Sequence, residues 1–181
     1  MVAARHAVEF ILAHQEPYPA VMVDRHWNVL RANAATQRVM ARFLDGPPRG
    51  GLNAMRAVFD PAGLRPCIEN WDEVAHALIE RIHREAEGPG DAETRALRDE
   101  LLAYPGVPAR WRSPQLDRPP VPLLSIVYRK GDLRLAFFTT ITTFGTPQDV
   151  TLQELRIECF FPADEATRAA LAADAGPGCA G

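Results

Sequence analysis

Residues 20–36, AVMVDRHWNVLRANAAT, contain two short apolar runs separated by a polar turn. The first run, 20–23, is short and rich in valine, as expected of a buried strand. The Asp and Asn of the following DRHWN favour a tight reversal, because such side chains can hydrogen-bond to nearby backbone. Residues 29–32 then return as a second strand, and Asn33 is a suitable N-cap for a helix over 34–44. The stretch therefore predicts strand, turn, strand and helix in immediate succession.

The clearest helical pattern covers residues 70–87, NWDEVAHALIERIHREAE. Its apolar residues recur at spacings of three and four and form one stripe: Trp71, Val74, Ala75, Leu78, Ile79 and Ile82. Asn70 is expected to cap this helix, with acidic residues in its first turn at the positive end of the dipole. Further helices are predicted over 3–14, 52–59 and 92–103.

Three strands are predicted near the C-terminus, over 123–129, 133–144 and 151–161, with a hairpin turn at 130–132. In the last strand apolar and polar residues alternate, which predicts one buried face and one mostly solvated face that includes Glu158. The buried set is expected to be Leu155, Ile157, Cys159 and Phe161. In the middle strand both alternating sets are semi-apolar, so periodicity does not decide which set faces the helices. The order of elements predicts an α+β fold, with helices on one face of a five-stranded antiparallel sheet.

Composition restricts the classes of partner. The chain has 181 residues, 47% hydrophobic and 24% charged, which is typical of one folded domain. Its net charge is −3, and its basic residues are scattered rather than gathered in a stripe, so direct binding to DNA is not expected. Three cysteines without CxxC spacing indicate a reducing compartment. With no signal peptide and no run of transmembrane length, we expect a cytoplasmic protein that does not enter a membrane.

Three segments carry a resemblance to a known family. They are PYPAVMVDRHWNVLRANAA (17–35), NAMRAVFDPAGLRPCIENWDEVA (53–75) and the later Trp111. The order of elements is similar to a PAS domain, and the three segments together resemble the ligand-binding domain of MmyB-like transcription regulators. The N-x-x-R-x-x-F-D-P of 53–61 and the Asn-Trp pair at 70–71 are the most specific parts.

The resemblance implies a PAS-like sensory module, usually found behind a helix-turn-helix of the XRE type. Only one helix precedes the module here, so contact with DNA is expected only through a helix-turn-helix that this chain does not contain. We expect residues 1–16 to form the N-terminal helix, 17–172 the ligand-binding domain and 173–181 a disordered tail. The N-terminal helix is expected to pack on its own sheet or on the same helix of a second subunit in a homodimer.

The resemblance also implies a small apolar or amphipathic ligand between sheet and helices. A fatty acid is the ligand type associated with the family. The residues expected to bind it are Arg56, Phe59, Trp71, Val74, Leu78, Phe137, Leu155 and Ile157. Trp71 is interpreted as a core anchor, a cavity wall or both. Arg56 either extends to solvent or pairs with an anionic group of the ligand.

Other chemistries have weaker support in the sequence. Glu73-x-x-His76 and Glu80-x-x-His83 have the spacing of di-iron ligands, but they lie about 10.5 Å apart along one helix, at 1.5 Å per residue, and cannot share a metal pair. We interpret both as part of a solvated helix face and expect no metal. No catalytic set is recognisable, and no cofactor is expected. The alternatives are a small α+β enzyme, a haem or flavin sensor (with an axial ligand among Met22, Met40, Met55 and Cys159 in the haem case), or a dimerisation module without ligand.

Overall fold

The computed structural model describes residues 2–46, 52–87, 92–113, 123–143 and 155–175, and the side chains from residue 6 onward. Five strands form one sheet: β1 (Ala20–Val23), β2 (Val29–Ala32), β3 (Leu124–Lys130), β4 (Leu133–Thr143) and β5 (Arg156–Pro162). Their order across the sheet is β2-β1-β5-β4-β3, and every neighbouring pair is antiparallel. The α+β class and the five-stranded antiparallel sheet predicted from the sequence are therefore confirmed.

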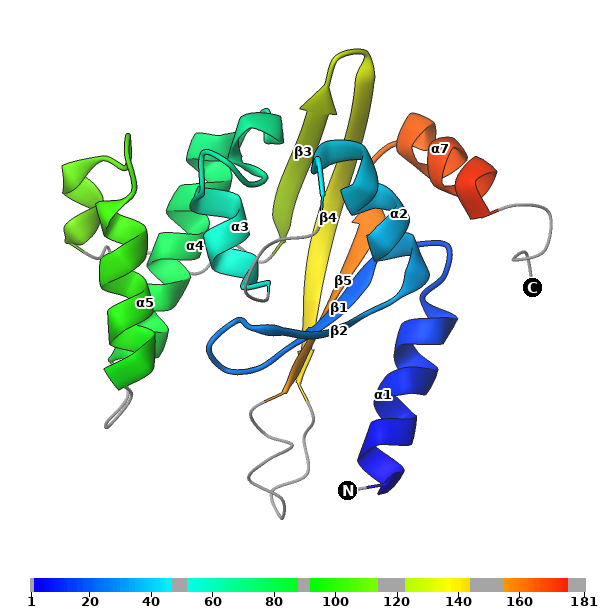
Figure 1. Cartoon of the computed structure of the whole chain (residues 1–181), viewed down its shortest axis with the longest axis horizontal. Helices are drawn as coiled ribbons and strands as arrows, with labels where there is room; N and C mark the ends of the chain where they lie inside the picture. The colour runs from blue at the N-terminus through cyan, green and yellow to red at the C-terminus, as the bar shows by residue number, and fades with distance from the viewer. Residues whose placement is uncertain (1, 47–51, 88–91, 114–122, 144–154, 176–181) are drawn as a thin grey trace.

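The helices between β2 and β3 occupy one side of this sheet (Figure 1). They are α2 (Ala34–Phe43), α3 (Ala54–Phe59), α4 (Trp71–Ala86) and α5 (Ala92–Ala103), with short 3₁₀ turns η1 (Arg65–Cys67) and η2 (Ala109–Arg112). The N-terminal helix α1 (Val2–His14) and the last helix α7 (Glu165–Ala175) complete the fold. Helix α7 extends three residues into the segment predicted as a tail, and residues 176–181 lie outside the described residues.

Asx side chains fix the β1–β2 turn and the start of α2, as predicted. One carboxylate oxygen of Asp24 accepts hydrogen bonds from the backbone of His26 (2.8 Å) and Asn28 (2.9 Å), which closes the β1–β2 turn. Asn33 caps α2, and Asn53 caps α3 in the same way. Asn70 departs from its predicted role: its side chain accepts from Val127 and donates to the carbonyl of Ser125. It therefore fastens the start of α4 to the edge strand β3 instead of capping the helix.

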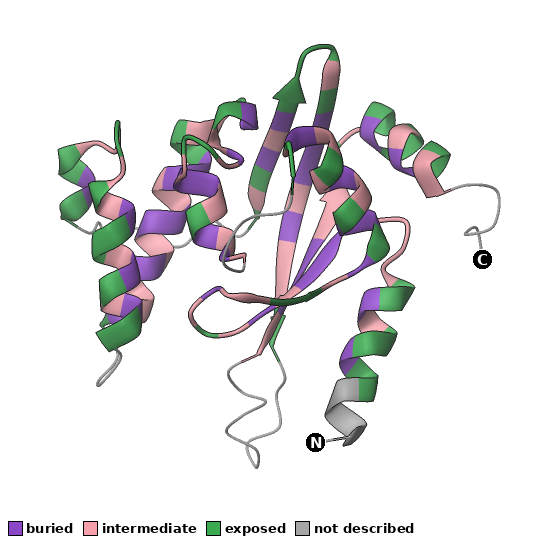
Figure 2. Ribbon diagram, viewed as in Figure 1, coloured by how far each residue is buried: buried purple, intermediate pink, exposed green. Residues whose placement is uncertain are grey.

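Helices cover both faces of the sheet, whereas the sequence predicted helices on one face. The main core lies under α2–α5 and includes Val21, Val23 and Phe137. A second cluster lies on the opposite face, where α1 packs Val8 and Leu12 on the sheet. Figure 2 shows the mixture of buried and exposed residues along the described part of α1.

The second cluster explains why the exposure predicted for β5 was wrong. Strand β5 alternates with period two, but both of its faces are covered, so Glu158 is only 8% exposed instead of solvated. Ile157 and Cys159 face α1, whereas Phe160 packs against the main core. In β4 the odd-numbered residues pair with the core-facing residues of β5, since Ile141 lies opposite Glu158. The odd-numbered set therefore faces the helices, which periodicity alone left open.

The prediction that one face of α4 is solvated is also wrong at one residue, His83. His83 is 5% exposed, and its Nε2 lies 2.8 Å from the backbone carbonyl oxygen of Trp111. The ring of His76 stacks on the indole of Trp111, with 5.3 Å between ring centres. The turn η2 thus covers a face of α4 that the helical pattern alone assigned to solvent.

Candidate ligand cavity

A cavity of about 80 Å³ lies between the core face of the sheet and helices α2, α3 and α4. All five strands contribute to it, because the core-facing residues of a sheet share one surface. Its apolar lining includes Val21, Val29, Val39, Met40, Met55, Val58, Leu78, Ile126, Phe137 and Phe160. A partly open space with this lining suits an apolar ligand.

Three polar side chains contribute to the lining: those of Thr36, Tyr128 and Glu158. The Thr36 hydroxyl already lies within hydrogen-bond distance of the Ala20 backbone and of the Asn33 side chain. Burial raises the pKa of the Tyr128 phenol, which keeps it protonated. Burial also raises the pKa of the Glu158 carboxyl, against the opposing effects of Arg81 and of a hydrogen bond with Thr139. No Lys, Arg or His belongs to the lining that the described residues form.

One wall of the cavity is the indole of Trp27, which the sequence reasoning missed. Trp27 is 1% exposed and has a positive φ of 67°, in the β1–β2 turn. Its Nε1–H donates to Glu85 (2.9 Å), and the guanidinium groups of Arg81 and Arg156 lie 5.4 and 5.1 Å from its ring centre. Arg156 also pairs with Glu85 at 2.6 Å. No local pattern could have revealed this cluster, because its members come from a turn, a helix and a strand far apart in the chain.

A cavity between a five-stranded sheet and the helices that cover it is suited to a ligand-binding domain. A comparison against protein families agrees with this. The family model of the MmyB-like transcription regulator ligand binding domain matches residues 4–173. The chain belongs to this family. The resemblance noted in the sequence is thereby confirmed, and the match includes α1.

A different likeness covers a shorter part of this MmyB-like domain. Proteins named Extracellular metalloproteinase 2 from Trichophyton tonsurans and Arthroderma benhamiae are each 30% identical to it over 64 residues. That segment is 35% of this chain and 10% of each relative. The chain therefore spans about a tenth of the length of the curated relatives it matches. In the described part of the chain, no helix is long and apolar enough to cross a bilayer.

Two of the eight residues predicted to bind a ligand line the cavity of this MmyB-like domain. Leu78 of α4 and Phe137 of β4 contribute to its wall. Leu155, just before β5, is half-buried and outside the lining. Ile157 lies on the opposite face of the sheet, against α1. Its predicted side was wrong because α1 covers that face and buries it equally well.

Arg56 does not line the cavity. Its guanidinium binds the Glu100 carboxylate with two hydrogen bonds, of 2.7 and 2.8 Å, and its side chain is 46% exposed. The hydrogen bond to Glu100 raises the pKa of Arg56. The N-x-x-R spacing places this arginine on the outer side of α3, while Met55 and Val58 on the inner side line the cavity.

Phe59, Trp71 and Val74 form part of the core beside the cavity. Phe59 and Val74 are fully buried, and the Trp71 ring meets the Phe59 ring edge-on at 5.9 Å. The Trp71 Nε1–H donates to the carbonyl of Val58 (2.9 Å), and the Arg65 guanidinium lies 3.8 Å above the indole. Trp71 therefore anchors the end of α3 on α4, and through Val58 it fixes one wall.

The residues considered as haem ligands are divided between the two faces of the sheet. Met40 and Met55 line the cavity, whereas Met22 and Cys159 belong to the cluster under α1. Among the residues that the structure describes, no three His, Cys, Asp or Glu side chains are grouped closely enough to hold a metal ion. Cys67 is 8% exposed, and its thiol lies 3.6 Å from the carbonyl oxygen of Phe43.

Proposed function

We propose that this MmyB-like domain binds one small apolar or amphipathic molecule, with an acyl chain, in the cavity. The carrying observation is the almost wholly apolar lining of the space between sheet and helices. Leu78 and Phe137 are the proposed contacts retained from the sequence, with Val21, Val58 and Trp27 as further contacts. The proposal includes the family role: occupancy biases a DNA-binding helix-turn-helix of the XRE type, in the cytoplasm.

The size of the cavity favours a medium-length chain. A space of about 80 Å³ holds roughly five to eight water-sized groups, at about 10–15 Å³ each. Burying about eight methylenes contributes roughly 6 kcal/mol, at ~0.8 kcal/mol each. Loss of free motion offsets several kcal/mol of that gain. The chain alone therefore supports binding of about millimolar affinity or weaker, and contacts to the head group must supply any tighter binding.

Contacts from the cavity through α2 to α1 could carry the effect of ligand binding to the N-terminal helix. Thr36 lines the cavity at the start of α2, and its hydroxyl meets the Asn33 side chain. The Asn33 amide in turn donates to the carbonyl of Leu12 in α1 (3.2 Å). A ligand that shifts α2 would thus shift α1, and two packings of one helix are a common basis for switching.

An enzymatic role is the alternative from another class. The local likeness to metalloproteinases would suggest a metal-dependent protease, yet none of the five histidines is followed by the Glu of an H-E-x-x-H motif. Among the described residues, the cavity lining also contains a single carboxyl group, in an apolar space. We therefore favour a binding role.

The most direct test is mass spectrometry of an organic extract of the purified protein, followed by titration of decanoic acid, 1-decanol and decanamide. Val21→Phe should block binding, because Val21 lines the cavity and the added ring occupies it. Met22→Phe is the matched control, since the adjacent residue faces α1 on the opposite side of the sheet. Equal binding by both variants, or no binding of any probe to the unmodified protein, would contradict the proposed cavity function.

A further inference from the structure

We propose that the cavity selects a ligand with an uncharged, hydrogen-bond-accepting head group, such as an ester, lactone or amide, and that Glu158 recognises this group. The inference rests on the proposed function, because it concerns the same cavity. It adds the chemical class of the head group and the residue that contacts it.

The first argument is the charge of the lining. The lining that the described residues form includes one carboxyl group and no basic side chain. Arg56, the cation predicted to receive an anionic head group, is bound to Glu100 outside the cavity. A carboxylate drawn into this space would lose its hydration and meet no basic side chain in the lining, which is unfavourable. Ligands with a neutral head group avoid that loss.

The second argument is the placement of Glu158. It lies in the middle of β5, between Val21 of β1 and Ile141 of β4, on the face that carries the cavity. Thr139 supplies a hydrogen bond to its carboxyl group. One hydroxyl does not use the full capacity of a carboxyl, which can donate one bond and accept several. The group is therefore able to bind a ligand atom.

The third argument is the protonation state of the groups around the site. Arg81 of α4 is the titratable group that acts on Glu158, and Glu158 in turn contributes to the raised pKa values of Tyr128 of β3 and Cys159 on the far side of β5. Burial is the largest influence on Glu158 and raises the pKa of its carboxyl, although Arg81 opposes it. A protonated carboxyl donates a hydrogen bond, and the protonated phenol of Tyr128 is a second donor in the lining. A carboxyl that burial favours in its protonated form and a protonated phenol together fit a carbonyl oxygen.

The experiment compares decanamide with decanoic acid, which have chains of equal length and head groups of similar size. Both are titrated into delipidated protein at pH 6 and pH 8, with tryptophan fluorescence and calorimetry as readouts. Decanamide should bind with an affinity that changes less than about twofold between the two pH values. Decanoic acid should weaken by up to about 100-fold, since only its protonated form enters and that form falls tenfold per pH unit above a carboxyl pKa of about 4.

Variants of Glu158 test whether this residue is responsible for the preference for a neutral head group. Glu158→Leu should weaken decanamide about tenfold, the effect of one lost hydrogen bond. Glu158→Gln keeps shape, neutrality and a donor, and should retain most of the affinity. Asp132→Asn, an exposed acidic residue in the β3–β4 turn, is the matched control and should change nothing. Thermal unfolding checks that each variant is folded.

The outcomes separate the two proposals. Equal affinities of amide and acid at pH 8, or unchanged amide binding in the leucine variant, would overturn the neutral-head inference and leave the cavity function intact. The comparison of ligands in the unmodified protein remains decisive even if the leucine variant fails to fold. No binding of decanamide, decanoic acid or 1-decanol would refute the proposed function itself.

Discussion

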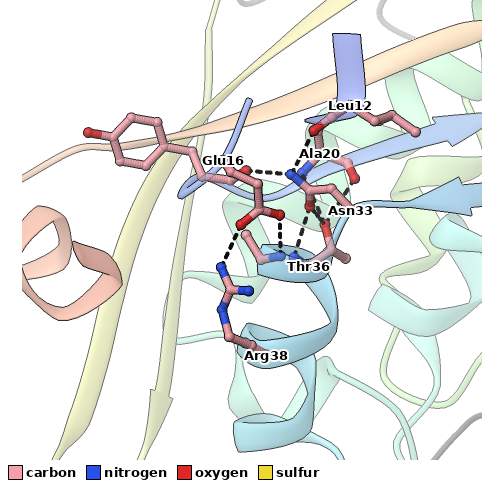
Figure 3. Close-up of polar contacts among 8 residues, drawn as sticks. Leu12, Glu16, Ala20, Asn33, Thr36 and Arg38 are labelled. Carbon is pink, nitrogen blue, oxygen red and sulfur yellow. Dashed lines mark hydrogen bonds and ion pairs between the residues drawn. The ribbon is translucent and has the colours of Figure 1, made fainter. Parts of the chain in front are cut away.

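Replacing Asn33 by Asp separates the two roles of this residue, which joins α1, β1 and α2 (Figure 3). Its side-chain oxygen accepts from the backbone N–H groups of Ala20 (3.1 Å) and Thr36 (3.0 Å), and so caps α2. Its amide nitrogen donates to the carbonyls of Leu12 (3.2 Å) and Tyr18 (2.8 Å). The Asn33→Asp variant keeps the oxygen that caps the helix and removes the donor.

The expected cost follows from the two carbonyl groups. Asn33 is 7% exposed, so both carbonyls lose a partner with little access to water. Leaving a buried polar group unsatisfied costs about 1–3 kcal/mol, whereas a negative charge at a helix N-terminus stabilises by about 0.3–1 kcal/mol. We therefore expect a net loss of about 3 kcal/mol in the free energy of unfolding. For a chain of this length, that loss lowers Tm by about 6–12 °C.

Urea and thermal unfolding at pH 7 measure the loss. Gln37→Glu is the matched control, because it makes the same amide-to-carboxylate change at an exposed position in the first turns of α2. It should change the stability by less than about 0.5 kcal/mol. A Tm of Asn33→Asp within 2 °C of the control would refute the idea that these two hydrogen bonds hold α1 to the sheet.

Further predictions concern α1, the buried acid and the surface pair. Leu12→Ala should lower the free energy of unfolding by about 2–5 kcal/mol, but by no more than the free energy with which α1 packs on the sheet. Phe10→Ala removes a larger side chain, yet it should cost much less, because Phe10 is 56% exposed. Urea unfolding of the two variants tests this difference. Burial raises the pKa of Glu158, so the folded protein retains a proton that the unfolded chain releases above pH 4.5. The stability gained by Glu158→Gln should therefore grow as the pH rises above 4.5, until the pKa of Glu158 in the folded protein is reached. A difference that does not change with pH would contradict this. Arg56→Ala should cost less than about 1 kcal/mol, because its pairing with Glu100 is exposed, and calorimetry should show unchanged affinity for decanoic acid.

The sequence by itself determined most of the local structure. The strands Ala20–Val23 and Val29–Ala32 and the helices capped by Asn33 and Asn53 follow from backbone propensity, turn chemistry and apolar spacing, all of which act between near neighbours. The order of elements and the N-x-x-R-x-x-F-D-P segment also indicated the family. These features can be predicted without knowing which elements pack against one another.

Only the tertiary structure decided which faces are buried and which side chains meet. The sequence indicated that β5 alternates, but the docking of α1 on the second face buried Ile157, and the cavity on the first face enclosed Glu158. The pairing of Arg56 with Glu100 and the contact of His83 with Trp111 likewise join residues 44 and 28 positions apart. Periodicity reports that two faces differ, whereas burial depends on the partner that covers each face, and that partner comes from a distant part of the chain.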